Sequence, residues 1–295
     1  MKIKIFHFRF IILPLILLTA LNTAINSQGT DSRRKYVGKD KLYLGITFIP
    51  QQTNISNEKF SATSVLNYKK GTSVNFALDG AYFFSRIAGI NIGAGFGSYS
   101  TKLSMDSYSI KFQTVDSENE SYEMRISGTS IVENQKISFL SIPVCLALRF
   151  PAGNKFGFYL KGGMSFEIPV VKTYEGTGTF TYDGYYSAYP ILLQDLPAYG
   201  FPSNLNTSAS GTLQIKSFNT ALVASGGAFF SVNKVIQLVL GAYFSKSLAN
   251  ISAYKPDSSF RLTSAANELN SFMAGSSSAG IQAFGLSFGV RFFLK

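Results

Sequence analysis

The chain has 295 residues, of which 15% are charged and 46% hydrophobic, and its formal net charge is +11. This composition is too apolar for an intrinsically disordered chain. Beyond the N-terminal region, no continuous apolar run is long enough to cross a bilayer as a helix. The apolar residues must therefore follow a short-period pattern along the chain.

The N-terminus has the pattern of an export signal. Three basic residues lie within the first nine positions, an apolar stretch follows at 10–21, and small or polar residues come next, with plausible cleavage after Ala24 or Ser27. We therefore predict a signal peptide at 1–27, a polar lead-in at 28–40 and the folded domain at 41–295. An uncleaved membrane anchor is the alternative. Because exported proteins rarely meet nucleic acid, the basic charge favours outer-membrane lipid and lipopolysaccharide as partners, and no nucleic acid.

Eight segments of the chain alternate between apolar and polar residues with a period of two. Such alternation is typical of half-apolar β-strands. The segments are 42–48, 74–84, 90–97, 141–150, 158–166, 218–230, 236–244 and 285–292.

The connections between these segments alternate strictly between long and short. The short ones are 86–89, 151–155 and 233–234, and the long ones are 54–70, 106–135, 171–211 and 251–280. Tight periplasmic turns and long external loops are typical of outer-membrane barrels. We therefore predict an all-β fold, an eight-stranded antiparallel up-and-down transmembrane β-barrel in the bacterial outer membrane, with both termini periplasmic.

A soluble eight-stranded barrel of the lipocalin kind is the structural alternative, because it alternates as well but turns its apolar face inward. Here the polar face is rich in Gly, Ser and Asn. Glycine on a water-facing strand is costly and packs against nothing, whereas inside a narrow barrel it makes room for larger neighbours. This pattern favours the transmembrane barrel.

Two of the long loops have structure of their own. Segments 107–115 and 121–132 alternate around the polar tip 116–120, which predicts a hairpin that projects above the membrane. If these segments were membrane strands the barrel would have ten, but no turn separates Met105 from Ser107. The third loop, 171–211, contains Tyr182, Tyr185, Tyr186 and Tyr189, which could bind an external protein or glycan or could pack the loop upon itself.

The chain offers little for catalysis. Its only histidine, His7, lies in the predicted signal peptide, so the mature chain lacks the usual general base, and with the single Cys145 it cannot build the usual zinc sites. The acidic tip residues Asp116, Glu118 and Glu120 match no defined calcium loop, and a solvated tip is the simpler interpretation. We expect no catalytic residue, no cofactor and no metal site.

If the alternation is correct, five charged side chains point into the barrel: Asp79, Arg149, Lys161, Glu167 and Arg291. Buried charges need partners. We therefore predict that Asp79 contacts at least one of Arg149, Lys161 and Arg291, and that Glu167 lies nearer the external mouth, in contact with water.

Two segments resemble a known family. The segment 139–150, with Leu140-Ser141-Ile142-Pro143, resembles the leucine-x-isoleucine-proline strand of the Bacteroidota outer-membrane β-barrel domain family, the PorT-like group. Segment 285–294 is similar to the last strand of that family. The resemblance implies a barrel assembled by the barrel-assembly machinery. Most members have no assigned function, and one is an accessory of a protein-secretion system, a role that fold analogy does not transfer.

Two functional hypotheses follow. The first is a non-enzymatic barrel that acts as an envelope scaffold or binds a partner through its loops. The second is a narrow channel for small solutes, since eight strands enclose a space that side chains nearly fill.

Overall fold

The computed structural model describes residues 41–60, 66–255 and 259–294, so the predicted signal peptide and lead-in lie outside the described residues. No helix within these ranges is long and apolar enough to cross a membrane. In chain order the elements are β1 (Leu42–Phe60), β2 (Asn67–Phe83), β3 (Ala88–Val115), β4 (Ser121–Pro151), β5 (Phe156–Tyr186), β6 (Ile191–Leu193), the 3-10 helix η1 (Pro197–Tyr199), β7 (Leu205–Thr212), β8 (Asn219–Ser231), β9 (Ile236–Ser247), the 3-10 helix η2 (Phe272–Gly275) and β10 (Ser276–Leu294).

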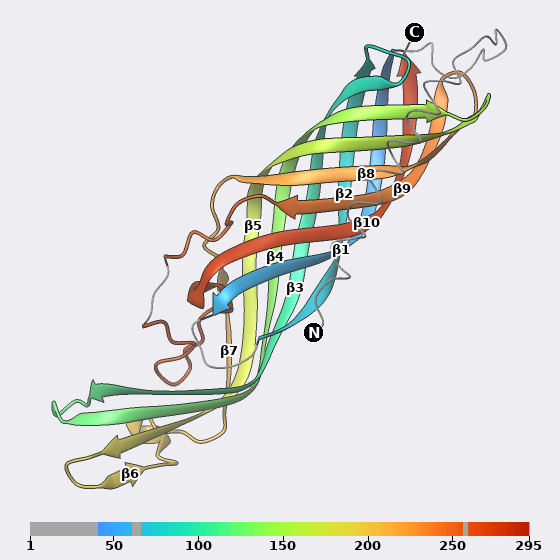
Figure 1. Ribbon diagram of the computed structural model, residues 1–295. Coiled ribbons are helices and arrows are strands. Elements are labelled where there is room, and N and C mark those ends of the chain that lie inside the picture. The colour runs from blue at the N-terminus through green and yellow to red at the C-terminus, as the bar shows by residue number, and fades with distance from the viewer. Residues whose placement is uncertain (1–40, 61–65, 256–258, 295) are drawn as a thin grey trace, which may run out of the picture.

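Eight of these strands form a closed antiparallel ring. The order is β1-β2-β3-β4-β5-β8-β9-β10, and β10 pairs with β1 to close it (Figure 1). The short strands β6 and β7 pair with β5 and lie outside the ring. The predicted eight-stranded barrel is therefore confirmed, and each of the eight predicted segments falls largely or wholly within one ring strand.

Tight turns join the strands at one end of the barrel. Residues 84–87, 152–155 and 232–235 make these three connections, and backbone hydrogen bonds such as Ser85 N–H to the Ala88 carbonyl close them. The start of β1 and the end of β10 pair at this same end, opposite the long connections (Figure 1).

The strands are much longer than a membrane crossing requires. A transmembrane β-strand needs about 9–11 residues, whereas β3, β4 and β5 have 28, 31 and 31. The expectation that 54–70 and 171–211 are loops was therefore wrong in large part, whereas the expected hairpin at 107–132 is confirmed. The strands continue beyond the membrane because each still finds a hydrogen-bonding partner there, and the predicted 107–132 hairpin is simply the end of β3 and β4. The described parts of the fourth connection, 248–255 and 259–275, are irregular apart from η2 and a bridge between Ser252 and Ile215.

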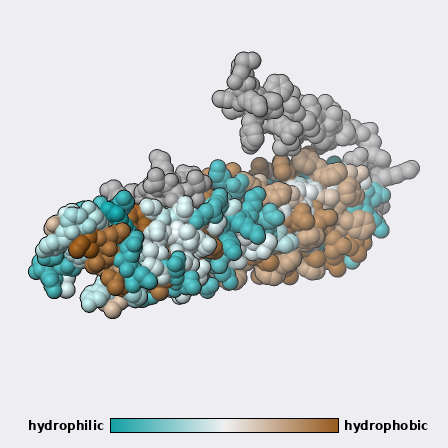
Figure 2. Space-filling view, turned by 90° about the horizontal axis from the view of Figure 1, so that it is seen from below, coloured by the Kyte–Doolittle hydropathy of each residue, from teal (hydrophilic) through white to brown (hydrophobic). Residues whose placement is uncertain are grey.

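The outward faces of the strands form an apolar belt. Leu44, Ile46, Phe76 and Leu78 are each more than half exposed, whereas Asp79 is only 7% exposed and faces the lumen. In Figure 2 the hydrophobic surface gathers over one end of the molecule, and the rest is mainly hydrophilic. Such an exposed belt is typical of a lipid-facing barrel and excludes a soluble barrel whose apolar face points inward.

The interior of the external half contains two apolar clusters. The first, which we call the lumen plug, joins β4 to β10, strands on opposite sides of the eight-membered ring, and therefore crosses the lumen. The second, which we call the external core, lies between the projecting β3–β4–β5 sheet and the fourth connection. The buried members of the lumen plug are Ile55, Tyr99, Ile137, Phe139, Leu213, Ile215, Ile251, Met273, Ala279, Ile281 and Ala283.

Candidate functional site: the closed lumen and the external end

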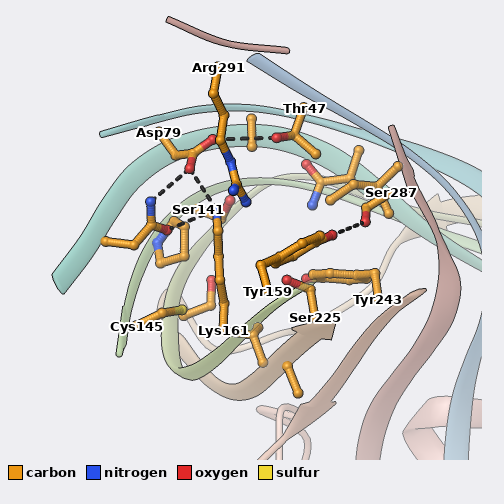
Figure 3. A pocket seen from close by; sticks show the side chains of 18 residues that line it. Thr47, Asp79, Ser141, Cys145, Tyr159, Lys161, Ser225, Tyr243, Ser287 and Arg291 are labelled. Atoms are coloured by element: carbon orange, nitrogen blue, oxygen red, sulfur yellow. Dashed lines mark hydrogen bonds and ion pairs between the residues drawn. The ribbon is translucent and has the colours of Figure 1, made fainter. Parts of the chain in front are cut away.

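A charged pair crosses the lumen below the plug. The Lys161 ammonium lies 2.6 Å from a carboxylate oxygen of Asp79, joining β5 to β2 (Figure 3). Asn91 donates to the same carboxylate at 2.7 Å, and the Tyr43 hydroxyl donates at 3.3 Å. Of the three cations proposed as partners for Asp79, Lys161 is the one that forms an ion pair with it.

The guanidinium groups of the two inward arginines lie over aromatic rings. The Arg291 guanidinium lies 4.8 Å from the Tyr43 ring and 4.7 Å from the Tyr159 ring, and it donates to Gln237 at 3.3 Å. Arg149 lies 3.9 Å from the Phe83 ring and donates to a backbone carbonyl. Cation–π contacts of this kind stabilise a desolvated cation.

Glu167 is separate from the Asp79 pair and is not in contact with water. It is 2% exposed, and its two oxygens accept hydrogen bonds from the Tyr99 hydroxyl and the Asn219 amide, each at 2.7 Å. The expectation of a wet carboxylate was wrong because Tyr99, itself part of the lumen plug, covers it. Glu167 thus connects the polar lumen to the plug above.

A small cavity lies around the Asp79–Lys161 pair. Its volume is about 80 Å³. It is lined by side chains such as Thr47, Ser141, Tyr243 and Ser287, together with the thiol-bearing Cys145 (Figure 3). Since a buried water occupies roughly 10–15 Å³ by this kind of measure, the cavity can hold a few waters. Toward the turns, Tyr43 and Phe83 pack in another apolar cluster, so the cavity has apolar side chains at both ends.

This polar interior has no arrangement that points to metal chemistry. Among the residues that the structure describes, no group of three or more His, Cys, Asp or Glu side chains is placed to hold a metal ion. The Asp79 carboxylate is already engaged by an ammonium, an amide and hydroxyls. The arrangement stabilises the packing of opposite barrel walls against each other.

The fourth connection is fastened to the barrel wall by a buried acid that the sequence analysis missed. Glu133 on β4 accepts hydrogen bonds from the Ser271 hydroxyl and the Phe272 backbone N–H, both at 2.8 Å, and from Gln135 at 2.6 Å. Burial raises the pKa of Glu133 to about 7, against these hydrogen bonds, which lower it. A sequence signal was available: Glu133 shares the inward face of β4 with the apolar residues Ile131 and Ile137.

The four tyrosines proposed as a binding surface have different environments. Tyr182 is fully buried in the external core and hydrogen-bonds Thr263 at 2.8 Å, so it cannot contact an external ligand. Tyr185 lies under the Arg125 guanidinium, at 4.5 Å. Tyr186 is half-buried, and Tyr189 is exposed. Including Tyr182 was wrong because the period-two pattern of β5 turns it inward.

The acidic hairpin tip organises its own turn. The Asp116 carboxylate accepts the backbone N–H groups of Glu118 and Glu120, each at 2.9 Å, and the Tyr186 hydroxyl at 2.9 Å. These hydrogen bonds lower the pKa of Asp116, and the one from the backbone N–H of Glu120 has the largest effect. The tip therefore ties the β3–β4 hairpin to the end of β5 and stiffens the projecting sheet.

Comparisons with known proteins place the chain in a family. The model of the outer membrane protein beta-barrel domain family matches residues 26–253, most of the chain. No curated protein matches it. Solved structures with a similar strand arrangement include the attachment invasion locus protein Ail of Yersinia pestis, in complex with the heparin analogue sucrose octasulfate (12% identity, 85% of this chain and 99% of that one, TM-score 0.30), and OprG of Pseudomonas aeruginosa (12%, 88% and 98%, 0.35). Neisserial surface protein A is a third (8% identity, 86% and 97%, TM-score 0.34). TM-scores this low carry no argument about function. The family match, the closed ring and the apolar belt together show that the chain belongs to the outer membrane protein beta-barrel domain family and is an integral protein of the outer membrane.

Proposed function

We propose that the protein is a non-enzymatic, membrane-anchored binding scaffold with a closed lumen. The observation that carries this proposal is the lumen plug. An ion or solute moving along the barrel axis would have to pass apolar side chains contributed by opposite walls. Removing an ion from water into such surroundings is costly.

The side chains of the lumen plug pack closely. The rings of Tyr99 and Phe139 stack with their centroids 4.2 Å apart and their planes at 13°. Met273 of η2 packs in the same cluster and is fully buried. Because η2 is fastened to Glu133, the irregular fourth connection supports the plug. The alternative of a narrow channel for small solutes is favoured only by the polar cavity below, which the plug covers.

Planar-bilayer recording of the refolded protein tests the closed lumen. In 1 M KCl we expect no discrete openings at moderate voltage. A variant in which Phe139 is replaced by Gly serves as the comparison, because it removes one of the stacked rings. Discrete openings of the unaltered protein would overturn the closed-lumen scaffold and support the channel.

The binding surface would lie at the external end, where apolar side chains are exposed without a lipid role. We call this set the tip patch: Tyr189, Ile191, Leu192, Leu196 and Tyr199, each at least 37% exposed. Tyrosine and aliphatic side chains together suit the buried centre of a protein–protein interface better than a sugar. Tyr185 and Tyr186 lie on the strand beside the tip patch. With Tyr189, they are the three expected tyrosines that are not fully buried.

Photo-crosslinking in intact cells tests the tip patch. A photoreactive residue at Tyr199, which is 76% exposed, should capture a protein and give a discrete larger species. The same residue at Ile46 in the apolar belt should give only lipid adducts. If Tyr199 and Tyr189 both give no protein adduct, the tip patch is not a protein-binding surface and the scaffold proposal loses its partner.

The remaining expectations concern the export of the chain and the orientation of the barrel in the membrane. We infer that residues 1–27 are a cleaved signal peptide and 28–40 a lead-in, and that the end carrying the tight turns faces the periplasm. Support comes from the apolar core at 10–21 and from the pairing of β1 and β10 at that end. The PorT-like resemblance, and with it any role beside a secretion system, rests on segments 139–150 and 285–294. Mass spectrometry of the mature N-terminus tests the cleavage of the signal peptide. Protease access to a C-terminal tag in intact cells tests whether the end with the tight turns faces the periplasm.

A further inference from the structure

The outward faces of β3 and β4 change abruptly where the apolar belt ends. On β3 the exposed Phe96 is followed, at successive outward positions, by Ser98, Ser100 and Lys102. On β4 the exposed Leu140 is the last apolar outward residue before Lys136 and Asn134. The boundary between hydrocarbon and headgroups must therefore lie between the apolar and the basic residues on these strands.

The strand register gathers lysines immediately beyond this boundary. Lys102 pairs with Lys69 on β2 and with Asn134 on β4, and Lys136 stands two positions from Asn134. Lys102 and Lys136 are thus diagonal neighbours, about 7–8 Å apart at their backbones. Lys69 and Lys102 are directly opposite each other, and like charges so placed on a sheet are destabilising. An anion held between Lys102 and Lys136 would therefore relieve a repulsion.

A groove of about 280 Å³ lies over these residues. Its outward side chains provide two ammonium groups, several hydroxyl and amide groups and one carboxylate: Ser100, Lys102, Asn134, Lys136, Thr173 and Glu175. Within the part of the chain that the structure describes, neither Lys102 nor Lys136 forms an ion pair. The groove therefore has a net positive charge and unused donors.

We propose that this groove binds the phosphate-bearing headgroup of a glycolipid in the outer leaflet. The phosphate lies between Lys102 and Lys136. The hydroxyl and amide groups of Ser100, Asn134 and Thr173 bind the sugar. The acyl chains run along the exposed side chains of Phe96 and Leu140 below, which distinguishes a glycolipid from free phosphate, because only the lipid contacts both surfaces.

A second groove at a similar height provides the matched control. It spans β9, β10 and β1, and Lys246 is the one charged side chain in its lining. Lys246 is outward-facing and exposed, like Lys102 and Lys136. Neutralising it alters the total charge by the same amount without touching the paired lysines.

Native mass spectrometry of the refolded protein in detergent tests the proposal, with bisphosphorylated lipid A as the probe. Lys102→Gln and Lys136→Gln should each weaken binding about fivefold, from roughly 1 kcal/mol per lysine near a membrane surface. Glu175→Gln should strengthen it, because a repelling carboxylate is removed. Lys246→Gln should change it less than twofold. Circular dichroism and heat-modifiability on gels check that each variant is folded.

The outcomes separate the sources of the anion. Loss of binding with dephosphorylated lipid A, together with no competition by inorganic phosphate at equal concentration, supports the glycolipid. Equal binding of the phosphorylated and dephosphorylated lipids would overturn the proposal, and so would effective competition by inorganic phosphate. Equal weakening by Lys246→Gln would show that only total charge matters and would also overturn it. Discrete openings in bilayer recordings or failed crosslinking at the tip patch would overturn the proposed function but would leave these lipid-binding measurements unaffected.

Discussion

Replacing Asp79 by Asn should destabilise the barrel far more than its small change in size suggests. The amide keeps the shape of the side chain and can still accept hydrogen bonds from Asn91 and Tyr43. It leaves the Lys161 ammonium, which lies 2.6 Å from a carboxylate oxygen in the unaltered protein, without its counter-charge. Arg291 adds a second cation to the same cavity lining. Breaking a buried pair on one side typically costs about 3–5 kcal/mol. We expect a loss of about that size in the free energy of unfolding.

Two further variants separate the charge effect from the loss of contacts. Lys161→Met should cost less, because Asp79 keeps its hydrogen bonds and Arg291 remains in the same lining. The double variant removes both charges and should cost clearly less than the sum of the single changes, with a coupling of about 1–3 kcal/mol.

Urea unfolding in detergent, followed by far-UV circular dichroism because the chain has no Trp, measures these differences. Glu118→Gln at the exposed hairpin tip is the control and should change stability by less than about 0.5 kcal/mol. If Asp79→Asn costs under about 1 kcal/mol, or if the two single effects simply add, the pair is not a buried charge pair and the reasoning is refuted.

Three other perturbations have expected results. Gly163→Ala should destabilise the barrel, because its new Cβ would collide with the backbone of β4, whereas Gly162→Ala should be tolerated, because its Cβ would enter open space. Urea-unfolding midpoints of the two variants measure the difference. Equal midpoints would contradict the close approach of β4 and β5. The raised pKa of Glu133 means that its protonated form stabilises the docked fourth connection: this contribution is complete below about pH 4.5 and is lost as pH rises through about 7, a change on the order of 3 kcal/mol. Trypsin cleavage after Arg261 in this connection, normalised at each pH to the cleavage rate of the unfolded chain, should therefore accelerate between pH 5 and 8, and Glu133→Gln should abolish that dependence; an unchanged normalised pH profile in the variant would assign it to other groups. Phe139→Gly should give measurable ion conductance in bilayers, because it opens the stacked part of the lumen plug, and a silent variant would mean that the rest of the plug suffices.

The membrane-spanning part of the fold could be predicted because lipid imposes a simple rule on it. Every outward residue there must be apolar, so the period-two pattern is plain at segments such as 74–84 and 285–292. The inward position of Asp79 followed directly from that pattern. Short turns at the opposite end from the loops then set the order of the strands.

The extent of the strands could not be predicted from the same rule. Beyond the belt both faces of β3 and β4 meet other surroundings: the inward face packs on loop residues and the outward face meets water. The pairing of β4 with β5 also shifts between Ser138 and Phe139, so that Val170 is an extra residue on β5 and the inward positions of β5 change there from odd to even numbers. A pattern that changes phase there resembles the end of a strand.

The contacts that close the lumen were hidden for a different reason. Residues such as Ile251 and Met273 come from the irregular fourth connection, where no periodicity marks which side chains turn inward. Glu133 was overlooked because its partners, Ser271 and Phe272, are almost 140 positions away in the chain. Long-range contacts of loops depend on the packed structure and leave little local trace in sequence.

Reaction of the single cysteine with a membrane-impermeant thiol reagent tests the closed lumen most directly. Cys145 lines the cavity below the plug and is 7% exposed, and it is the only Cys in the chain. A Cys145→Ser/Asn233→Cys variant, with the thiol in an exposed turn, gives the rate for open access, and unfolding in guanidinium gives complete labelling. We expect folded Cys145 to react at least a hundredfold more slowly than the turn cysteine, since labelling would require opening of the barrel. Labelling at a similar rate would show an open lumen and contradict it.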